Sequence, residues 1–567
     1  MPRPAAPLAV PSAWANAVAD SAAPSCPPRL LRPWLLAALL TLSGGCQASD
    51  RAPLPPLPPP PPGAPGASAA EASPLHWPVP PPPPLQPANP VLWVALAARL
   101  GPAPAAVPAA EPTAAPAAAP AAPLQLTAAG GLLTLVDGAG QRFEAPAFSL
   151  HWRWQTLGQP FSLRRRVLGP FASYESAEAA AQRWAAAGAQ PRIARPGEWE
   201  VWAAAEAPLP ADIPSRLVER RETRRLLLEL RRPQGAVQLQ GPIRIEAPAG
   251  LRWKQGIYGG PFRLLADAHG GWSLVEEVPL ERYLEGVVPH EIGAGSPPAA
   301  LAAQAVLART WALRNRGRYR LDGYHLCADT QCQVYSDPSQ AGSAVRQAIA
   351  ASHGQVLAAG GQPIQAVYHA SNGGIAAGLH EAWDVEPAPY LRPFADGSTA
   401  FAARHPLPLA ASALPELLQG GPGAYGADHP LFRWRRQLTA GQISAALAAR
   451  GSSVGQPRRL TVLQRGESGR VLALEIGGSA GVVVLRRDAI RRTLRSLPST
   501  LFLLAPAGEG AWWVDGGGFG HGAGLSQAGA IDLARRGWSS DRILQHYYPG
   551  ARLQPLEAIG AALQAGG

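Results

Sequence analysis

The chain has 567 residues, including 64 Pro and 60 Gly, and carries 50 basic against 39 acidic side chains, a formal charge of +11. This length allows two or three domains, but Pro and Ala dominate the first part, which excludes a chain folded throughout. The positive charge suits any acidic polymer. Because no basic stripe with interleaved aromatic residues follows a recognisable nucleic-acid motif, we expect no nucleic-acid partner.

The first 48 residues have the parts of a leader segment. A basic stretch at residues 29–32 precedes the apolar run 34–42, which is short for a membrane span and typical of a secretory signal. Ser43-Gly44-Gly45-Cys46 is close to a bacterial lipoprotein box, so a lipid anchor at Cys46, cleavage near Ala48 and an uncleaved anchor all remain open. Each outcome predicts an exported protein in the periplasm or cell envelope.

Residues 49–124 are rich in Pro and Ala, with proline-rich runs at 55–62 and 80–84. They show no periodic apolar face, and a segment without such a face cannot contribute to a core. We therefore expect a disordered, extended linker over residues 49–124. Folded structure is expected to begin after it.

Residues 125–235 have the pattern of a small α+β region. A strand at 165–171 runs into a Gly-Pro-Phe turn, and a helix at 175–187 leads to a strand at 191–194. Over residues 160–205 this order resembles half of a SPOR module, a small fold that binds glycan strands stripped of peptides. An unrelated α+β unit fits the same pattern.

Residues 240–555 predict a second, larger α+β domain. Short strands punctuated by glycine come first, and helices follow them. The expected elements are strands at 243–245, 258–260, 262–264, 272–275, 355–357 and 364–368, and helices at 279–288, 298–315, 525–536 and 539–547. Pro298 suits the first turn of its helix, where its missing N–H has no partner to lose. The mixture makes α+β the expected fold class of the folded part.

Six separated motifs lie in order between residues 280 and 550. They are Leu280-Glu281-Arg282-Tyr283-Leu284-Glu285-Gly286-Val287-Val288-Pro289-His290-Glu291-Ile292, Ala303-Gln304-Ala305-Val306-Leu307-Ala308-Arg309-Thr310, Cys332-Gln333-Val334-Tyr335, Tyr368-His369-Ala370-Ser371-Asn372-Gly373-Gly374, Gly520-His521-Gly522-Ala523-Gly524-Leu525-Ser526-Gln527 and His546-Tyr547-Tyr548-Pro549-Gly550. Each motif alone is weak. Together and in this order they resemble the stage II sporulation protein D/amidase-enhancer (SpoIID/LytB) family.

The resemblance implies a chemistry. Enzymatic members of the family are lytic transglycosylases, which cut the MurNAc–GlcNAc bond of peptidoglycan without water and leave a 1,6-anhydro sugar, and their acid lies at the position of Glu291. One carboxyl suffices for this reaction, because it protonates the leaving oxygen and then, as a carboxylate, takes the proton of the sugar's own 6-hydroxyl. Without the resemblance, Glu291 is a surface acid at a helix end.

The residues around Glu291 suit an acid. Apolar Val288 and Ile292 flank it, and partial desolvation would raise the pKa of its carboxyl group and keep that group protonated. Glu281 and Glu285 lie four residues apart on the preceding helix, and we expect both to be solvated. Glu285 is the second candidate if the reaction requires two carboxylates.

The same resemblance assigns substrate binding to eight further residues: Gln304, Arg309, Tyr368, His369, Ser371, Asn372, His521 and Gln527. Sugars need donors and acceptors for their amide and hydroxyl groups, and a tyrosine ring offers a stacking surface. Alternatives stay open: Arg309 in a structural ion pair, a simple turn at Asn372, and His521 as a structural histidine. We expect the glycine-rich run 516–524 to let the backbone and His521 approach the glycan, since its spacing does not fit a phosphate cradle.

His325, Cys327 and Cys332 lie close together in sequence. Some family members bind zinc in this stretch, but three ligands leave a four-ligand site incomplete, and Gln331 stands where a ligand His often occurs. A disulfide between the two cysteines suits an exported protein. We rank the disulfide first, reduced thiols second and zinc third, and we expect no cofactor.

Two rival functions remain open beside the enzyme. The amidase-enhancer name implies a non-catalytic, wall-binding modulator of an N-acetylmuramoyl-L-alanine amidase, and the Pro-rich segment suggests a structural spacer. A binder needs no protonatable group at Glu291, so the presence of this residue favours the enzyme. The expected partners are peptidoglycan glycan strands, including strands stripped of stem peptides, and, in the modulator function, an amidase.

Overall fold

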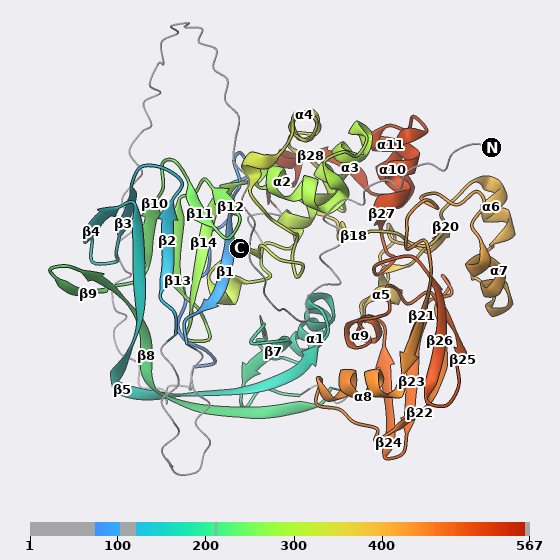
Figure 1. The fold of residues 1–567 in the computed structure, drawn as a ribbon, viewed down its shortest axis with the longest axis horizontal. Helices are drawn as coiled ribbons and strands as arrows, with labels where there is room; N and C mark the ends of the chain where they lie inside the picture. The colour runs from blue at the N-terminus through green and yellow to red at the C-terminus, as the bar shows by residue number, and fades with distance from the viewer. Residues whose placement is uncertain (1–73, 103–120, 210–212, 562–567) are drawn as a thin grey trace, which may run out of the picture. The chain divides into compact units, whose positions relative to one another are not determined.

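The structure is a computed structural model that describes residues 74–102, 121–209 and 213–561. Within these residues the strands form several sheets, and helices occur between them along the chain. The predicted α+β class is therefore confirmed (Figure 1). No helix in the described part combines the length and apolar character that a membrane crossing requires. The predicted leader, with Cys46, lies outside the described residues.

A seven-stranded sheet supplies much of the main core, in the order β15-β1-β14-β13-β10-β3-β4. Its strands are β15 (Leu326–Cys327), β1 (Val91–Leu100), β14 (Trp272–Pro279), β13 (Phe262–Ala266), β10 (Ile243–Glu246), β3 (Leu133–Val136) and β4 (Arg142–Ala145). Alternate side chains of β3 and β10, including Leu133, Leu135, Ile243 and Ile245, are fully buried in this core. The strand predicted at residues 243–245 is therefore confirmed as β10, and β3 shows the same period of two.

Strand β1 corrects the expected linker. It pairs antiparallel with β14 and parallel with β15, and Leu92 and Val94 are fully buried in the main core. Ala95 packs into a second core, around helix α1 (Tyr174–Ala186). Because β1 is covered on both faces, its apolar run lacks strict alternation, and the prolines around it dominate the composition. The prediction of disorder over residues 49–124 is wrong for residues 91–100, and much of the remaining segment lies outside the described residues.

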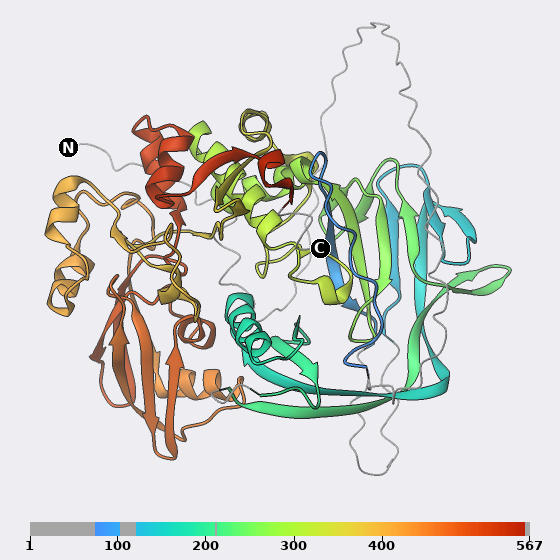
Figure 2. The same ribbon diagram turned by 180° about the vertical axis from the view of Figure 1, so that it is seen from behind.

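The second sheet has eight strands. Six follow the order β12-β11-β2-β5-β7-β6, and β8 pairs with both β5 and β9. They are β12 (Gly256–Tyr258), β11 (Leu251–Trp253), β2 (Leu124–Ala128), β5 (Ala147–Phe171), β7 (Trp199–Ala204), β6 (Arg192–Ala194), β8 (Ser215–Arg232) and β9 (Gly235–Leu239). The long strands β5 and β8 run side by side (Figures 1 and 2).

The two sheets cross the domain boundary predicted at residues 235–240. Strand β9 occupies that boundary, β10 pairs with β3, and β11 pairs with β2. Strands from both sides of the boundary therefore share hydrogen bonds, and the structure has no break there. The sequence shows where strands lie but not which distant strands pair.

The predicted strand, helix and strand order of residues 165–194 is confirmed. Helix α1 follows β5, with Ser173 as its N-cap accepting a hydrogen bond from the Ser176 amide, and β6 follows α1. Trp184 on α1 and Trp199 on β7 are buried in the core between them. The likeness of this unit to a SPOR module remains a prediction.

Helices α2 (Leu280–Val288) and α3 (Pro298–Arg314) confirm two further expected elements. Helix α3 starts at Pro298 and is buried along nearly its whole length, between α2, α4 (Ser343–Ala351) and β16 (Gln355–Ala359). Gly286 on α2 has a packing reason, because a Cβ there would lie 2.5 Å from the Ser336 carbonyl oxygen. The missing side chain lets α2 lie directly against the segment that follows the cysteines.

The C-terminal helices close the same core. Helices α10 (Gln527–Arg535) and α11 (Ser540–Tyr547), red in Figures 1 and 2, both contact α3. Strand β28 (Arg552–Pro555) pairs with β16, and β16 pairs with β17 (Gln362–Pro363). The strand expected at residues 364–368 is mostly irregular, and only β18 (Tyr368–His369) pairs, in parallel, with β27 (Leu525–Ser526).

Residues 375–517 form a part that the sequence interpretation did not separate. Their three-stranded sheets have the orders β21-β26-β25 and β22-β23-β24, and β19 pairs with β20. The elements are β19 (Ile375–Ala376), α5 (Leu379–Ala382), β20 (Phe394–Ala395), α6 (Thr399–Arg404), α7 (Leu414–Gln419), β21 (Arg433–Thr439), α8 (Ala440–Ala448), β22 (Pro457–Arg465), β23 (Val471–Gly478), β24 (Gly481–Arg486), α9 (Asp488–Thr493), β25 (Phe502–Pro506) and β26 (Ala511–Gly517). Much of this part packs around its own apolar clusters.

Candidate functional site

A cavity of about 250 Å³ holds Glu291 in its wall. Four parts of the chain line it: α1, the segments that follow α2 and α3, the paired segments around Tyr368 and His521, and the part that includes α9. Its charged lining residues are Glu175, Glu291, Arg318, Glu381, Arg487, Asp488, Arg491 and Arg492. Trp311, Tyr368, Trp383 and His521 add aromatic faces. A cavity with ring faces and charged groups around one carboxyl suits a polar, ring-shaped substrate.

Glu291 lies on a π-helical turn, Pro289–Gly293, that continues directly from α2. Pro289 has no N–H to offer the preceding helical turn, which favours this local change in winding, and such turns are frequent at functional sites. Ile292 is buried beneath the turn, while Glu291 is only partly exposed. The turn therefore holds the carboxyl group at the cavity wall with its backbone fixed by the core.

The carboxyl group of Glu291 has defined partners. The Val334 amide donates a 2.8 Å hydrogen bond to Oε1, and the Tyr368 hydroxyl also hydrogen bonds to the carboxyl group. Burial raises the pKa of Glu291 to about 7, although these two hydrogen bonds lower it. The backbone amide of Val334 therefore fixes Oε1 of the carboxyl group.

A short chain of hydrogen bonds orients the Tyr368 hydroxyl. The Tyr283 hydroxyl donates to Gln333 Oε1 at 3.2 Å, and Gln333 Nε2 donates to the Tyr368 oxygen at 2.9 Å. Since the Tyr368 oxygen already accepts one bond, its hydrogen is left for Glu291. Tyr283 and Gln333 are buried, so water does not compete for these bonds. These hydrogen bonds thereby fix the direction from which the Tyr368 hydroxyl approaches Glu291.

The segment Cys332–Tyr335 positions Glu291 from the other side. Cys332 is bonded to Cys327 with their Cα atoms 5.7 Å apart, which confirms the disulfide ranked first. Gln333 and Val334 reach Tyr368 and Glu291 as described, and Tyr335 stacks on Tyr283 with ring centroids 5.0 Å apart. Each residue of this predicted motif therefore holds the acid or its supports.

The expected alternative of zinc at His325, Cys327 and Cys332 does not fit this arrangement. Both sulfur atoms are bonded to each other. His325 Nδ1 accepts from the Trp93 amide at 2.9 Å, and its Nε2 lies 3.0 Å from the Pro83 carbonyl oxygen. In the part of the chain that the structure describes, three or more His, Cys, Asp or Glu side chains nowhere gather as a metal site would need. In this stretch the two cysteines therefore form a structural disulfide.

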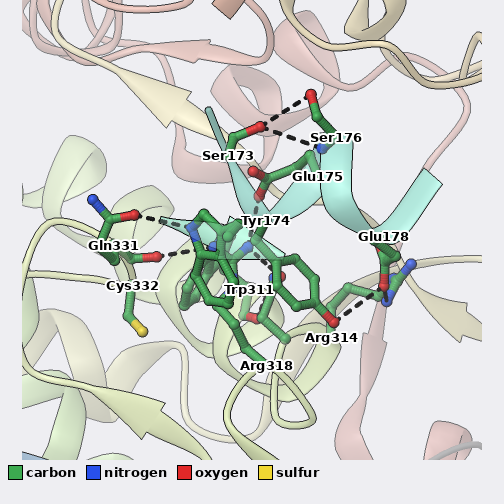
Figure 3. Close-up of polar contacts among 12 residues, drawn as sticks. Ser173, Tyr174, Glu175, Ser176, Glu178, Trp311, Arg314, Arg318, Gln331 and Cys332 are labelled. Carbon is green, nitrogen blue, oxygen red and sulfur yellow. Dashed lines mark hydrogen bonds and ion pairs between the residues drawn. The ribbon is translucent and has the colours of Figure 1, made fainter. Parts of the chain in front are cut away.

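Helix α1 contributes to the cavity wall through a buried ion pair. Glu175 Oε1 accepts a 2.6 Å hydrogen bond from Arg318, and Arg318 is only 4% exposed. Arg318 also donates to the Gln331 carbonyl oxygen at 2.9 Å, next to Cys332 (Figure 3). Its guanidinium lies 4.2 Å from the centre of the Tyr174 ring. The small α+β unit therefore contacts the cavity wall beside the acid through this ion pair and the Tyr174 ring.

Tyr368 and His521 are the predicted substrate-binding residues that line the cavity. His521 Nε2 lies 2.8 Å from the Tyr368 carbonyl oxygen, and its Nδ1 accepts from the Ala523 amide at 3.2 Å. Burial and the nearby charge of Arg491 lower the pKa of His521 to about 3, so its ring is neutral. With both nitrogens engaged, His521 offers the cavity its ring face.

Three other predicted binding residues lie away from the cavity. Gln527 Nε2 donates to Gln304 Oε1 at 3.4 Å, and both side chains are buried. Arg309 is fully buried and donates to both carboxylate oxygens of Glu281, at 2.7 and 2.6 Å. Glu281 keeps 28% of its side-chain exposure, so the predicted solvation holds in part, but the sequence does not show that a buried arginine pairs with it. Glu285, which is 20% exposed, pairs with its neighbour Arg282.

The turn after Tyr368 faces inward. His369 is buried, and its Nδ1 lies 3.1 Å from the Ala523 carbonyl oxygen. Ser371 accepts from the Gly373 amide at 3.3 Å, and Asn372 donates to Asp396 at 2.6 Å. None of His369, Ser371 and Asn372 lines the cavity around Glu291. Ser371 and Asn372 accept hydrogen bonds within the turn, which agrees with the alternative of a simple turn at Asn372.

The glycine-rich run 516–524 allows close contact within the protein. A Cβ at Gly518 would lie 2.6 Å from the Ser371 carbonyl oxygen, and one at Gly524 would lie 2.0 Å from the Val367 carbonyl oxygen. Both glycines also have positive φ angles. The run packs along residues 367–373, so the close approach that these glycines permit is to another protein segment, whereas a glycan was expected.

Residues 268–358 match the family model for stage II sporulation protein, and this region contains Glu291, Gln333 and Val334. This chain carries a SpoIID/LytB-family domain. Residues 377–524 match a second model, a domain of unknown function (DUF8618).

Relatives of the SpoIID/LytB-family region cover about half of this chain. This chain is 27% identical over 300 residues to stage II sporulation protein D of Bacillus subtilis (strain 168), and the match spans 50% of this chain and 77% of that protein. It is 29% identical over 307 residues to stage II sporulation protein D of Bacillus amyloliquefaciens, with the same two shares. The amidase enhancer of Bacillus subtilis (strain 168) is 28% identical over 292 residues, which are 48% of this chain and 40% of that protein.

The cavity residues that sequence reasoning missed come largely from outside the SpoIID/LytB-family match. Trp383, Arg487 and Arg491 belong to residues 377–524, and Glu175 belongs to α1. No spacing in the sequence could have placed them beside Glu291, because the fold brings them there from distant positions. Val334 was missed for another reason: it acts through its backbone amide, which carries no residue-type signal.

Proposed function

We propose that this protein is an exported lytic transglycosylase that cleaves MurNAc–GlcNAc bonds in peptidoglycan glycan strands, with Glu291 as its acid and base. The observation that carries the proposal is a carboxyl group in a cavity wall whose pKa burial raises to about 7. The family membership and the amidase-enhancer relative support a role at the cell wall. The proposed reaction uses no cofactor.

The proposed reaction has two proton transfers. Protonated Glu291 donates its proton to the glycosidic oxygen as the C1–O bond breaks, which leaves positive charge on the ring of the MurNAc sugar. The 6-hydroxyl oxygen of that sugar then bonds to C1, and the Glu291 carboxylate takes the hydroxyl proton. A carboxyl group with a pKa near neutrality exchanges protons efficiently in both directions. The Val334 and Tyr368 hydrogen bonds hold the carboxyl group in place for both steps.

The aromatic residues Trp383 and His521 in the cavity wall have a supporting role in this proposal. Trp383 and His521 lie with ring centroids 4.7 Å apart and present flat surfaces beside Tyr368. Such surfaces suit the apolar faces of sugar rings and limit access of water to the ring cation. Exclusion of water favours attack by the 6-hydroxyl over hydrolysis. The disulfide supports an oxidising, exported location.

The test is the product formed in ¹⁸O-labelled water. Full-length protein is incubated with intact and with amidase-treated peptidoglycan, and the released fragments are analysed by mass. We expect fragments that end in anhydro-MurNAc, one water lighter than hydrolysed ends, and without ¹⁸O at C1. Reducing ends that carry ¹⁸O would show a hydrolase and reject the transglycosylase.

The amidase-enhancer relative favours one second function, a wall-binding modulator of an N-acetylmuramoyl-L-alanine amidase. This function needs no proton on Glu291. It is favoured if the wild-type protein releases no fragments from any strand yet increases the rate at which an added amidase removes stem peptides. The Glu291→Gln variant would then increase that rate as well as the wild type does.

A further inference from the structure

Of the four arginines that line the cavity, two have an ion-pair partner within the protein. Arg318 pairs with Glu175 at 2.6 Å, and Arg487 pairs with Asp384 at 2.9 Å. Arg491 and Arg492 also line the cavity, and among the described residues neither has a carboxylate oxygen within 4.0 Å. Asp488 attracts Arg491, and Arg492 attracts Asp488 and Glu175, but none of these carboxylates bonds to either guanidinium. A desolvated arginine whose hydrogen-bonding groups have no bonded partner is costly, so it points to an anionic ligand.

Arg491 faces the same space as the acid. It lies on α9, is partly buried, and makes no hydrogen bond within the described part of the protein. Burial lowers the pKa of its guanidinium to about 10, so the group remains charged at neutral pH. Its charge contributes to the lowered pKa of His521, which lines the same cavity.

We propose that Arg491, with Arg492 beside it, forms a subsite that binds a carboxylate of the glycan substrate. The arginines belong to residues 377–524, so this domain of unknown function would select substrates for the acid in the neighbouring domain. A planar guanidinium matches a carboxylate through two parallel hydrogen bonds, which gives direction as well as affinity. The inference rests on the proposed function, because it assumes that a glycan occupies the cavity.

Peptidoglycan has two sources of carboxylate. The lactyl group of MurNAc ends in a free carboxylate when its stem peptide has been removed, whereas an intact strand has an amide there and carries its carboxylates farther out on the peptide. Arg491 shares a cavity of only about 250 Å³ with Glu291. A group on the reacting sugar itself fits so small a cavity better than a peptide side group, so the lactyl carboxylate is the expected ligand.

The experiment compares three substrates with the full-length protein: intact strands, amidase-treated strands, and amidase-treated strands whose carboxylates have been converted to amides. Arg491→Gln should lower kcat/KM on amidase-treated strands by about 10- to 100-fold, as expected for a lost charged hydrogen bond. It should change little on the amidated strands. Arg491→Lys keeps the charge and should recover part of the loss. Arg495→Gln, at an exposed position outside the cavity, is the matched control.

Different outcomes separate the possible ligands. Equal losses on amidase-treated and amidated strands would overturn the carboxylate subsite. A loss confined to intact strands would reject the lactyl group and assign the subsite to a carboxylate of the stem peptide.

Binding keeps this inference independent of catalysis. Co-sedimentation of Glu291→Gln and of Glu291→Gln/Arg491→Gln with the same strands measures affinity without cleavage. One outcome is that the wild type cleaves no strand, while adding Arg491→Gln to Glu291→Gln weakens binding about tenfold only to strands that carry carboxylates. The subsite is then supported and the proposed reaction is rejected. If cleavage occurs and affinity does not depend on Arg491, the subsite fails and the reaction stands.

Discussion

The two regions that line the cavity differ in whether their polar side chains have bonding partners within the protein. Around residues 268–358, Glu291 and Gln333 have defined hydrogen-bond partners within the protein. In residues 377–524, Arg491 and Arg492 line the same cavity without a carboxylate within 4.0 Å among the described residues. A proton-transferring group needs a fixed geometry, which internal hydrogen bonds supply. A group that selects a ligand needs unused bonding capacity, which the ligand completes.

The largest effect is expected from Glu291→Gln, which removes the proton of the acid. Glu291→Gln keeps the shape of the side chain and its Val334 hydrogen bond but cannot donate a proton. We expect release of 1,6-anhydro product to fall by about 10²- to 10⁴-fold, as is typical of a lost acid or base, while strand binding persists. Glu285→Gln, near the surface on the preceding helix, is the matched control and should keep wild-type activity. An unchanged rate in Glu291→Gln would remove Glu291 from the reaction.

Tyr368→Phe tests the support of the acid. The change removes the hydroxyl that bonds to Glu291 and leaves Gln333 Nε2 without its acceptor. We expect kcat to fall by about tenfold, in line with the loss of one hydrogen bond to a charged group, with KM little changed. Because the Tyr368 hydrogen bond lowers the pKa of Glu291, the alkaline limb of the rate profile should move to higher pH. A limb that moves to lower pH would contradict this role.

Reduction of the disulfide should have a moderate effect. Cys332 directly precedes Gln333 and Val334, so opening its bond to Cys327 loosens the segment that holds the acid. We expect a reductant to lower activity by a few-fold and to lower the melting temperature, while a chelator changes neither. The Cys327→Ser/Cys332→Ser variant should start at the reduced level and respond no further. Sensitivity to the chelator alone would revive the zinc alternative.

The smallest effect on catalysis is expected from the ion pair of Arg309 and Glu281. Arg309→Gln leaves Glu281 without its buried partner and should lower the melting temperature clearly. Activity per folded molecule should stay near that of the wild type, because neither residue lines the cavity. Kinetics at a temperature where the variant is folded check this. A large rise in KM would show that Arg309 contacts substrate after all.

Much of the local structure follows from the sequence. Helix α3 is marked by Pro298 and by small residues that allow tight packing, and strands such as β3 and β10 are marked by alternating apolar residues. The position of Glu291 came from a motif and its desolvation from the apolar neighbours Val288 and Ile292. In each case the signal lies within a few residues of the feature it predicts.

The remaining features depend on contacts between distant residues. Strand β1 was hidden by the prolines around it, and the pairing of Arg309 with Glu281 joins two helices. Ser371 and Asn372 carry the same side chains whether they bind a sugar or build a turn, and only the packing of residues 516–524 shows which way they face. Arg491 reaches the acid through the fold alone, so no sequence spacing predicts it.

The pH dependence of kcat/KM for anhydro-MurNAc release by the wild type tests the central claim most directly. Burial raises the pKa of Glu291 from 4.5 to about 7, and the acid form is the one that starts the reaction. The rate should therefore be maintained up to about pH 7 and fall tenfold for each further pH unit. A rate that stays constant from pH 6 to about pH 9, or one that begins to fall near pH 4.5, would contradict a burial-tuned acid at Glu291.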